Sequence, residues 1–399
     1  MNKKFLIWDN AKDAMLSLVL FLMLIGCVNV FSASFVEAES MFKSGYHYLF
    51  RYILFAVTGF FIMWYVGYKM DYHSFFRYKG LIYAGMFAAL VYVDAFSRSV
   101  KGAQRWIILG PISFQPSEFV KLGVLIIGAS YLGKLMEKGR KPHLYKMDVN
   151  QAFLGALLLA ALVYKQPDMG TAAIILALML VLYFVAGMPG KEMAAVLGLG
   201  LGAAALMIIR EPYRFNRVKV WFDPWVDPQG AGYQTVQSLV SIGSGGLIGN
   251  PLGMGTGKFF YLPEAHTDFA FAIFCQEWGF LGALFLMVLF ILLCASMYAI
   301  AKETRDRSGF LLVTGANFFL VGQAVANMAM VCGILPVIGV PLTFISYGGT
   351  SLWASLIAVG LVISVYRHEL KTAQEQQPEP APRFRPSPGY RVQERRWRP

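Results

Sequence analysis

The chain has 399 residues, of which 57% are hydrophobic and only 15% are charged, and its formal net charge is +12. A soluble domain of this size needs a larger charged fraction on its surface, so the composition excludes the soluble class. The basic residues are spread over short segments between apolar runs and over the C-terminal end. This distribution favours contact with anionic lipid headgroups and argues against a nucleic-acid partner.

Ten apolar runs approach the length needed to cross the roughly 30 Å of hydrocarbon in a bilayer. They span residues 15–35, 48–66, 81–96, 118–135, 151–164, 171–187, 193–209, 269–300, 309–331 and 351–366. The runs predict an all-α, polytopic membrane protein with about ten transmembrane helices in residues 15–366. One long external loop, residues 210–268, is expected between the seventh and eighth helices.

The basic residues also predict the orientation. With the N-terminus inside, the cytoplasmic segments carry 23 Lys and Arg residues and the external segments carry 12, as the positive-inside rule requires. Residues 1–14 are therefore expected to be cytoplasmic, and the first run is too long for a cleaved signal peptide. Residues 367–399 are basic and poor in aliphatic residues, which predicts a disordered cytoplasmic tail.

Polar motifs gather on the predicted external side, and the first opens the fourth helix. It comprises Gln115, Pro116, Ser117, Glu118 and, one turn later, Lys121. Pro116 and Glu118 suit the first turn of a helix. Lys121 opposes the helix dipole there, so its pairing with Glu118 has two interpretations: an ordinary ion pair within the helix, or a functional pair.

A second external motif, residues 165–171, lies between the fifth and sixth helices and contains Asp168. Asp168 fits the N-cap position of the sixth helix. It also adds one more carboxylate to the external side, so a functional role stays open beside the capping role.

The long external loop combines basic and aromatic residues near its start, including Arg210, Arg214 and Trp221. A strip of this kind on an external membrane loop favours lipid headgroups or polyprenyl phosphates. Seven glycines follow between positions 243 and 257. They could form a backbone cradle for phosphate oxygens or a plain turn, and they do not match a Walker A loop.

The octapeptide 262–269 places Glu264, His266 and Asp268 directly before the eighth helix. Charge at a membrane boundary is costly and is usually functional. Thr267 or Asp268 could cap the helix, but capping does not explain Glu264, His266 or the later Glu277. Carboxylates facing a basic loop suit glycosyl or phosphoryl transfer, which needs a base for the attacking hydroxyl and cations for a leaving diphosphate.

Residues 333–351 form the last external loop and contain no charge, which predicts a re-entrant loop covered by protein.

The cysteines stand singly in apolar stretches and are expected to be small core residues, with neither a disulfide framework nor a metal cluster: Cys27, Cys275, Cys294 and Cys332.

Together these motifs resemble those of the SEDS family (shape, elongation, division and sporulation), which includes FtsW, RodA and SpoVE. The resemblance spans residues 15–366, with the motifs in the family's order. They are residues 102–106, 115–118, 166–171 and 232–234, the glycine run, residues 263–269 and residues 345–351.

The resemblance implies a ten-helix peptidoglycan glycosyltransferase of the bacterial cytoplasmic (inner) membrane. Such an enzyme polymerises lipid II, the lipid-linked disaccharide pentapeptide, at the outer face. Asp268 is then the catalytic residue, acting as general base for the acceptor GlcNAc 4-hydroxyl. Beside this residue we expect diphosphate contacts from Arg105, Lys121 and Arg210, supporting or metal-linked carboxylates at Glu118 and Asp168, and further substrate contacts from Gln115, Glu264 and His266.

The resemblance further implies a class B penicillin-binding protein, a single-pass transpeptidase, as partner, together with other divisome or elongasome proteins. A divalent cation, Mg²⁺ or Mn²⁺, fits the family, although no ligand spacing in the sequence identifies its site. No nucleotide-binding motif is present, and an external transferase must draw on a lipid-activated donor.

Three alternatives stay open from the sequence. The motifs favour the division (FtsW-like) type over the elongation (RodA-like) type, and they do not exclude the latter. A lipid II flippase would need polar groups along a path through the membrane, whereas the carboxylates here gather on one side. A scaffold that only recruits a partner would leave Asp268 and Lys121 without a role.

Overall fold

The computed structural model describes the chain over residues 4–97, 105–109, 112–143, 145, 147–210, 218–259 and 262–376. Ten helical segments coincide with the ten predicted runs: α1 (Ala11–Phe42), α2 (His47–Tyr68), α4 (Lys79–Phe96), α5 (Pro116–Glu137), α6 (Met147–Lys165), α7 (Met169–Val185), α8 (Gly190–Arg210), α11 (Ala270–Glu303), α12 with η3 and α13 (Arg307–Asn317, Phe318–Gly322 and Gln323–Val331), and α14 (Gly349–Glu375).

The all-α, polytopic fold is confirmed. Seven of the described segments are long and apolar enough to cross a membrane, and α6 and α7 are shorter apolar helices. The structure adds a small antiparallel hairpin that the sequence did not predict, in which β1 (Ile107–Leu109) pairs with β2 (Ile112–Phe114). Its strands are rich in isoleucine, whose β-branched side chain favours extended backbone.

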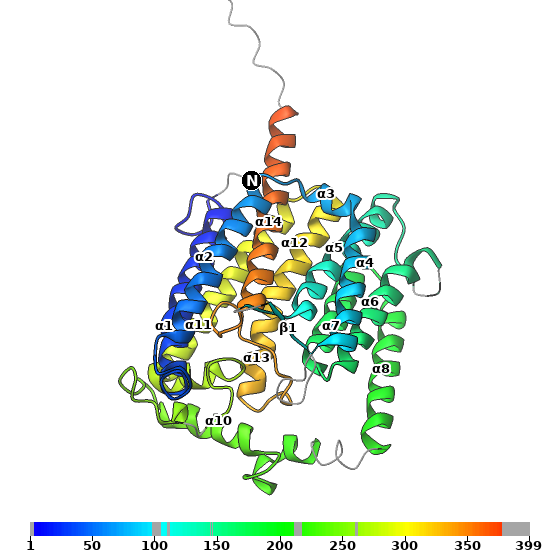
Figure 1. Ribbon diagram of the computed structural model, residues 1–399. Helices are drawn as coiled ribbons and strands as arrows, with labels where there is room; N and C mark the ends of the chain where they lie inside the picture. The colour runs from blue at the N-terminus through cyan, green and yellow to red at the C-terminus, as the bar shows by residue number, and fades with distance from the viewer. Residues whose placement is uncertain are drawn as a thin grey trace, which may run out of the picture.

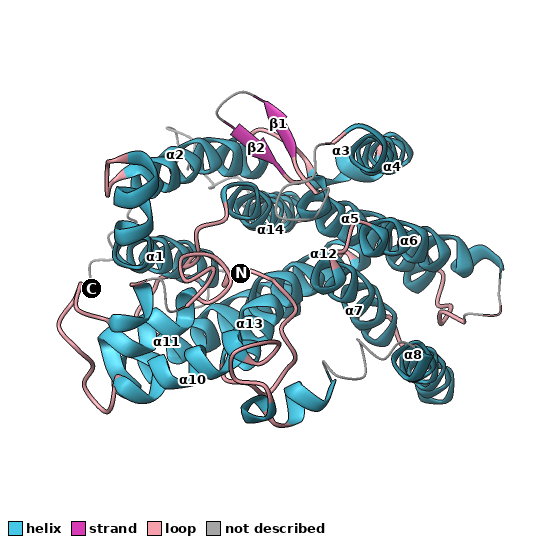
Figure 2. Cartoon of the chain, turned by 60° about the horizontal axis from the view of Figure 1, so that its bottom comes forward, coloured by secondary structure: helices cyan, strands magenta, loops and turns pink. Residues whose placement is uncertain are grey.

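The long helices run roughly parallel, and α14 and α12 lie between the group of α1, α2 and α11 and the group of α4 to α7 (Figures 1 and 2). α14 packs most extensively on α2 and also contacts α5 and α12. The short α3 (Tyr72–Arg77) joins α2 to α4. We call the end of the bundle that carries the N-terminus the cytoplasmic end and the opposite end the external end, following the predicted orientation.

The described part of the long loop is folded. It contains η1 (Pro224–Val226), α10 (Tyr233–Ser244) and η2 (Thr256–Lys258), and α10 lies across the external end of the bundle (Figure 1). Residues 211–217, with Arg214 in the predicted basic strip, lie outside the described residues, as do 98–104 and the tail from residue 377.

The second half of the last external loop is covered by protein, as predicted, whereas Ile334 and Val337 in its first half are exposed. Val340, Leu342 and Ile345 are buried, and the Tyr52 hydroxyl donates a 2.6 Å hydrogen bond to the Phe344 carbonyl. Buried partners of this kind satisfy irregular backbone at membrane depth. The cysteine prediction was partly wrong: all four are free, but only Cys275 is buried, and Cys332 is exposed.

Candidate active site

Asp268 lies at the external end, in the last turn before α11. The N-cap residue of α11 is Phe269, and no side chain caps this helix. The capping role considered for Thr267 or Asp268 is therefore wrong. The Asp268 carbonyl instead accepts a 2.7 Å hydrogen bond from the Asn327 amide, which also donates to the Val340 carbonyl. Asn327 thus fastens the start of α11 to the last external loop.

Asp268 as a residue is half-buried, and its carboxylate makes no hydrogen bond to any described residue. It faces Gly339, where an added Cβ would lie 3.5 Å from Asp268 Oδ2. Gly339 has a φ of 66°, a left-handed conformation that glycine adopts without strain. The loop thereby turns tightly beside the carboxylate.

Electrostatics around Asp268 favour its protonated form. Burial, followed by the carboxylates of Glu264 and Asp168, raises its pKa to about 7, and the Arg105 guanidinium opposes this rise. The Glu118 carboxylate also raises the pKa of Asp268, by a smaller amount. The structure therefore brings four of the predicted site residues into the electrostatic surroundings of Asp268. A carboxyl with a pKa near neutrality can accept a proton and release it again at physiological pH.

Asp168 caps α7, as one of its two interpretations predicted. Its Oδ1 accepts from the Thr171 N–H at 3.2 Å. Its Oδ2 accepts from the Gln115 amide at 3.1 Å and from the Ser117 hydroxyl at 3.2 Å. Asp168 thus joins the start of α7 to the start of α5, two of the predicted external motifs.

Arg105 reaches the same junction from the residues before β1. Its Nε donates a 3.0 Å hydrogen bond to the Gln166 carbonyl, and its terminal nitrogen donates to the Pro167 carbonyl. These bonds use part of the guanidinium fork and hold its charge near Asp268. The side chain of Arg210, at the end of α8, lies outside the described residues.

Glu118 and Lys121 form a fully buried ion pair at 2.9 Å, which confirms the intrahelical pairing. Lys121 also donates a 2.7 Å hydrogen bond to the Gln323 side chain, whose amide donates to the Pro341 carbonyl. The Glu118–Lys121 pair is therefore linked through Gln323 to the last external loop. Contact between Lys121 and a diphosphate stays a prediction, and it would require the ion pair to open.

Glu264 and His266 point in different directions. Glu264 accepts a 2.9 Å hydrogen bond from the Thr267 hydroxyl and contributes to the field at Asp268. His266 Nδ1 lies 3.1 Å from a carboxylate oxygen of Glu37 on α1, and its ring packs on that of Tyr48. His266 therefore ties the octapeptide to α1 and α2.

The glycine run forms a turn against α11. The N–H groups of Gly253 and Gly257 donate to the side chains of Glu277 and Gln276, both at 3.1 Å. These N–H groups already donate hydrogen bonds within the protein, which favours the plain-turn interpretation over a phosphate cradle. Glu277 also forms an ion pair with Lys258 at 3.1 Å, so Lys258 balances the charge of the Glu277 carboxylate.

Among the described residues, the external carboxylates form no group of three with metal-ligand spacing. Both oxygens of Asp168 accept hydrogen bonds from protein donors, and Glu118 is paired with Lys121. A catalytic Mg²⁺ or Mn²⁺ stays a prediction.

A family model described as "Cell cycle protein", covering FtsW, RodA and SpoVE, matches residues 13–371. The chain belongs to the FtsW/RodA/SpoVE family. It is 37% identical over 355 residues to the probable peptidoglycan glycosyltransferase FtsW of Geobacter sp. (strain M18), covering 88% of this chain and 95% of the relative. It is 35% identical over 354 residues to the stage V sporulation protein E of Bacillus subtilis, with the same coverage.

Solved structures of this FtsW/RodA/SpoVE family share the fold. A chain from a study titled "Structural coordination of polymerization and crosslinking by a peptidoglycan synthase complex" superimposes with a TM-score of 0.72 at 29% identity, covering 89% of this chain and 97% of its own length. The Thermus thermophilus rod shape determining protein RodA superimposes with a TM-score of 0.66 at 29% identity, covering 89% and 96%.

Sequence reasoning missed several residues that organise the site: Ser117 as a partner of Asp168, and Gln323, Asn327 and Glu37. A signal was available for two of them. Gln323 and Asn327 are uncharged polar residues one helical turn apart within a mostly apolar run. Polar side chains in a membrane-spanning helix face the protein interior and mark functional regions.

Proposed function

We propose that this chain is a peptidoglycan glycosyltransferase that polymerises lipid II at the outer face of the bacterial cytoplasmic membrane. The observation that carries the proposal is the Asp268 carboxyl, which has a pKa of about 7, has no hydrogen-bond partner among the described residues, and lies beside the tight turn at Gly339. The names of its relatives, at 34–37% identity, support the same activity.

In the proposed reaction, Asp268 takes the proton of the acceptor GlcNAc 4-hydroxyl. The hydroxyl oxygen then forms a bond to the anomeric carbon of the donor glycan, and the bond from that carbon to the polyprenyl diphosphate breaks. The diphosphate leaves with the bonding electron pair, and cationic groups nearby stabilise its developing charge. Arg105 is the described cation in the field of Asp268. Asp268 must then release its proton before the next addition.

We propose a class B penicillin-binding protein as the partner that crosslinks the new strands. A structural neighbour comes from a study of a peptidoglycan synthase complex that couples polymerization to crosslinking. The curated relatives named FtsW favour a role in cell division over a role in elongation.

Polymerisation in detergent separates this proposal from lipid II flipping, because a micelle has no leaflets between which a flippase could act. Purified protein with its transpeptidase partner is expected to convert lipid II into long glycan strands, detected after gel separation. The Asp94→Asn variant, which changes an external carboxylate paired with Lys165, should retain the activity. Absence of polymer with partner and divalent ions present, together with lipid II translocation into vesicles, would favour the flippase.

A further inference from the structure

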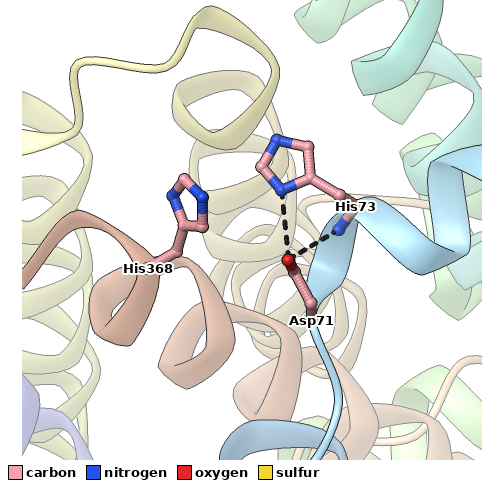
Figure 3. A group of neighbouring side chains, drawn as sticks. All are labelled: Asp71, His73 and His368. Atoms are coloured by element: carbon pink, nitrogen blue, oxygen red, sulfur yellow. Dashed lines mark hydrogen bonds and ion pairs between the residues drawn. The ribbon is translucent and has the colours of Figure 1, made fainter. Parts of the chain in front are cut away.

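The cytoplasmic end of the bundle carries a cluster that the proposed reaction does not use. Asp71 and His73 stand at the start of α3, and His368 projects toward them from α14 (Figure 3). One ligand atom from each residue lies within 4.8 Å of the other two. Nearly 300 residues separate α3 from His368, so the fold itself assembles the group.

We propose that Asp71, His73 and His368 bind a divalent transition-metal ion, with Zn²⁺ as the fitting species. Two imidazoles and one carboxylate are a common zinc ligand set, with bonds of about 2.0–2.2 Å and a water as fourth ligand. Tetrahedral ligand atoms then lie about 3.4 Å apart. Asp71 and His73 are exposed, and rotation of these two side chains can close the present spacing to that value.

The simpler account of the cluster explains only two of its members. Asp71 caps α3 by accepting from the His73 N–H at 3.0 Å, and its carboxylate pairs with His73 Nδ1, also at 3.0 Å. His368 is left over. Its Nδ1 is buried and has no hydrogen-bond partner among the described residues. Because buried polar atoms are nearly always paired, His368 is the member of the cluster that hydrogen bonds within the protein do not account for.

Tyr72 contacts both imidazoles of the cluster. The Tyr72 ring packs on His73 at 4.1 Å and meets His368 edge-on at 5.4 Å between ring centroids. Tyr72 is fully buried, and its hydroxyl donates a 2.7 Å hydrogen bond to Asp306. The neighbouring Arg367 donates to the Gly67 carbonyl on α2. A bound ion would tie the segment after α2 to α14, whose C-terminal end protrudes beyond the bundle (Figure 1).

The experiment measures Zn²⁺ binding to the full-length protein, purified without a histidine tag and stripped with a chelator. Wild type is expected to bind one Zn²⁺ per chain and to unfold at a higher temperature when Zn²⁺ is added. His73→Gln and His368→Gln should each weaken binding by more than the roughly 10–100-fold that loss of an outer-sphere partner costs. Both should also lose the thermal shift.

His143→Gln is the matched control, because His143 also belongs to the cytoplasmic end but pairs with Glu192 at 2.6 Å. It should bind Zn²⁺ as wild type does. Equal unfolding temperatures in chelator establish that the cluster variants are folded. Equal Zn²⁺ affinity of wild type and His368→Gln, or no saturable site at micromolar Zn²⁺, would overturn the proposal. Metal binding is read directly here, so the outcome is independent of glycan synthesis.

Discussion

The Glu264→Gln substitution tests the electrostatics of the site. Asp268 acts as a base only when it is ionised, so the polymerisation rate should rise with pH and reach half its maximum near pH 7, the pKa of Asp268. The Glu264 carboxylate favours the protonated form of Asp268. Removing its charge should lower the pKa of Asp268 and shift the rising limb toward lower pH.

The size of the shift follows from the causes of the raised pKa. The rise from 3.8 to about 7 corresponds to roughly 4 kcal/mol at 1.36 kcal/mol per unit. Burial supplies the largest part, and the carboxylates of Glu264, Asp168 and Glu118 share the rest against Arg105. One carboxylate therefore contributes about one unit or less, and we expect the midpoint to fall by about half a unit to one unit.

The assay is the initial rate of glycan formation by purified protein with its partner, from about pH 5.5 to 8.5. Glutamine keeps an oxygen that can accept from the Thr267 hydroxyl, as Glu264 does, so the loop should keep its shape. Asp94→Asn serves as the control and should leave the midpoint unchanged. An unchanged or higher midpoint in Glu264→Gln, or an equal shift in the control, would refute this electrostatic account.

Three further predictions concern stability and charge. The folded protein keeps the Asp268 proton up to about pH 7, so its free energy of unfolding should fall between pH 4 and 7. At pH 8, Asp268→Asn should be more stable than wild type by about 1–2 kcal/mol after allowance for solvent screening. Equal chemical denaturation profiles of the two proteins would contradict this. Lys121→Met leaves Glu118 buried without its charge partner and should lower the free energy of unfolding by about 3–5 kcal/mol. Adding Glu118→Gln should recover part of that stability. No recovery would mean that the two residues are not coupled. Arg105→Lys keeps the charge but loses the guanidinium fork, so polymerisation should fall measurably at unchanged expression, and wild-type rates would show that charge alone suffices.

Much of the fold could be predicted from the sequence, because apolar length against bilayer thickness decides whether a segment spans the membrane. The predicted ends of the helices were less accurate than their number and order. α1 continues to Phe42 and α11 to Glu303, beyond the predicted runs, because a helix that leaves the bilayer keeps its backbone hydrogen bonds while its composition becomes polar. Composition therefore marks the membrane boundary and not the helix end.

The site was predictable in outline only. Helix order places the carboxylates of Glu118, Asp168 and Asp268 at one end of the bundle, and the structure brings them into one electrostatic field. The sequence does not give the rotation of each helix about its axis. Contacts that depend on this rotation, such as His266 with Glu37 and Asn327 with the Asp268 carbonyl, could not be predicted.

The central claim is that Asp268 does chemistry and does not hold the fold together. The most direct test compares glycan synthesis from lipid II by wild type and Asp268→Asn at matched concentrations with the same partner, alongside the unfolding temperature of each. The account predicts that the Asn variant is folded, binds the partner and forms no polymer from pH 6 to 8.5. Polymerisation by the Asn variant at a rate near that of wild type would contradict the assignment of Asp268 as the general base.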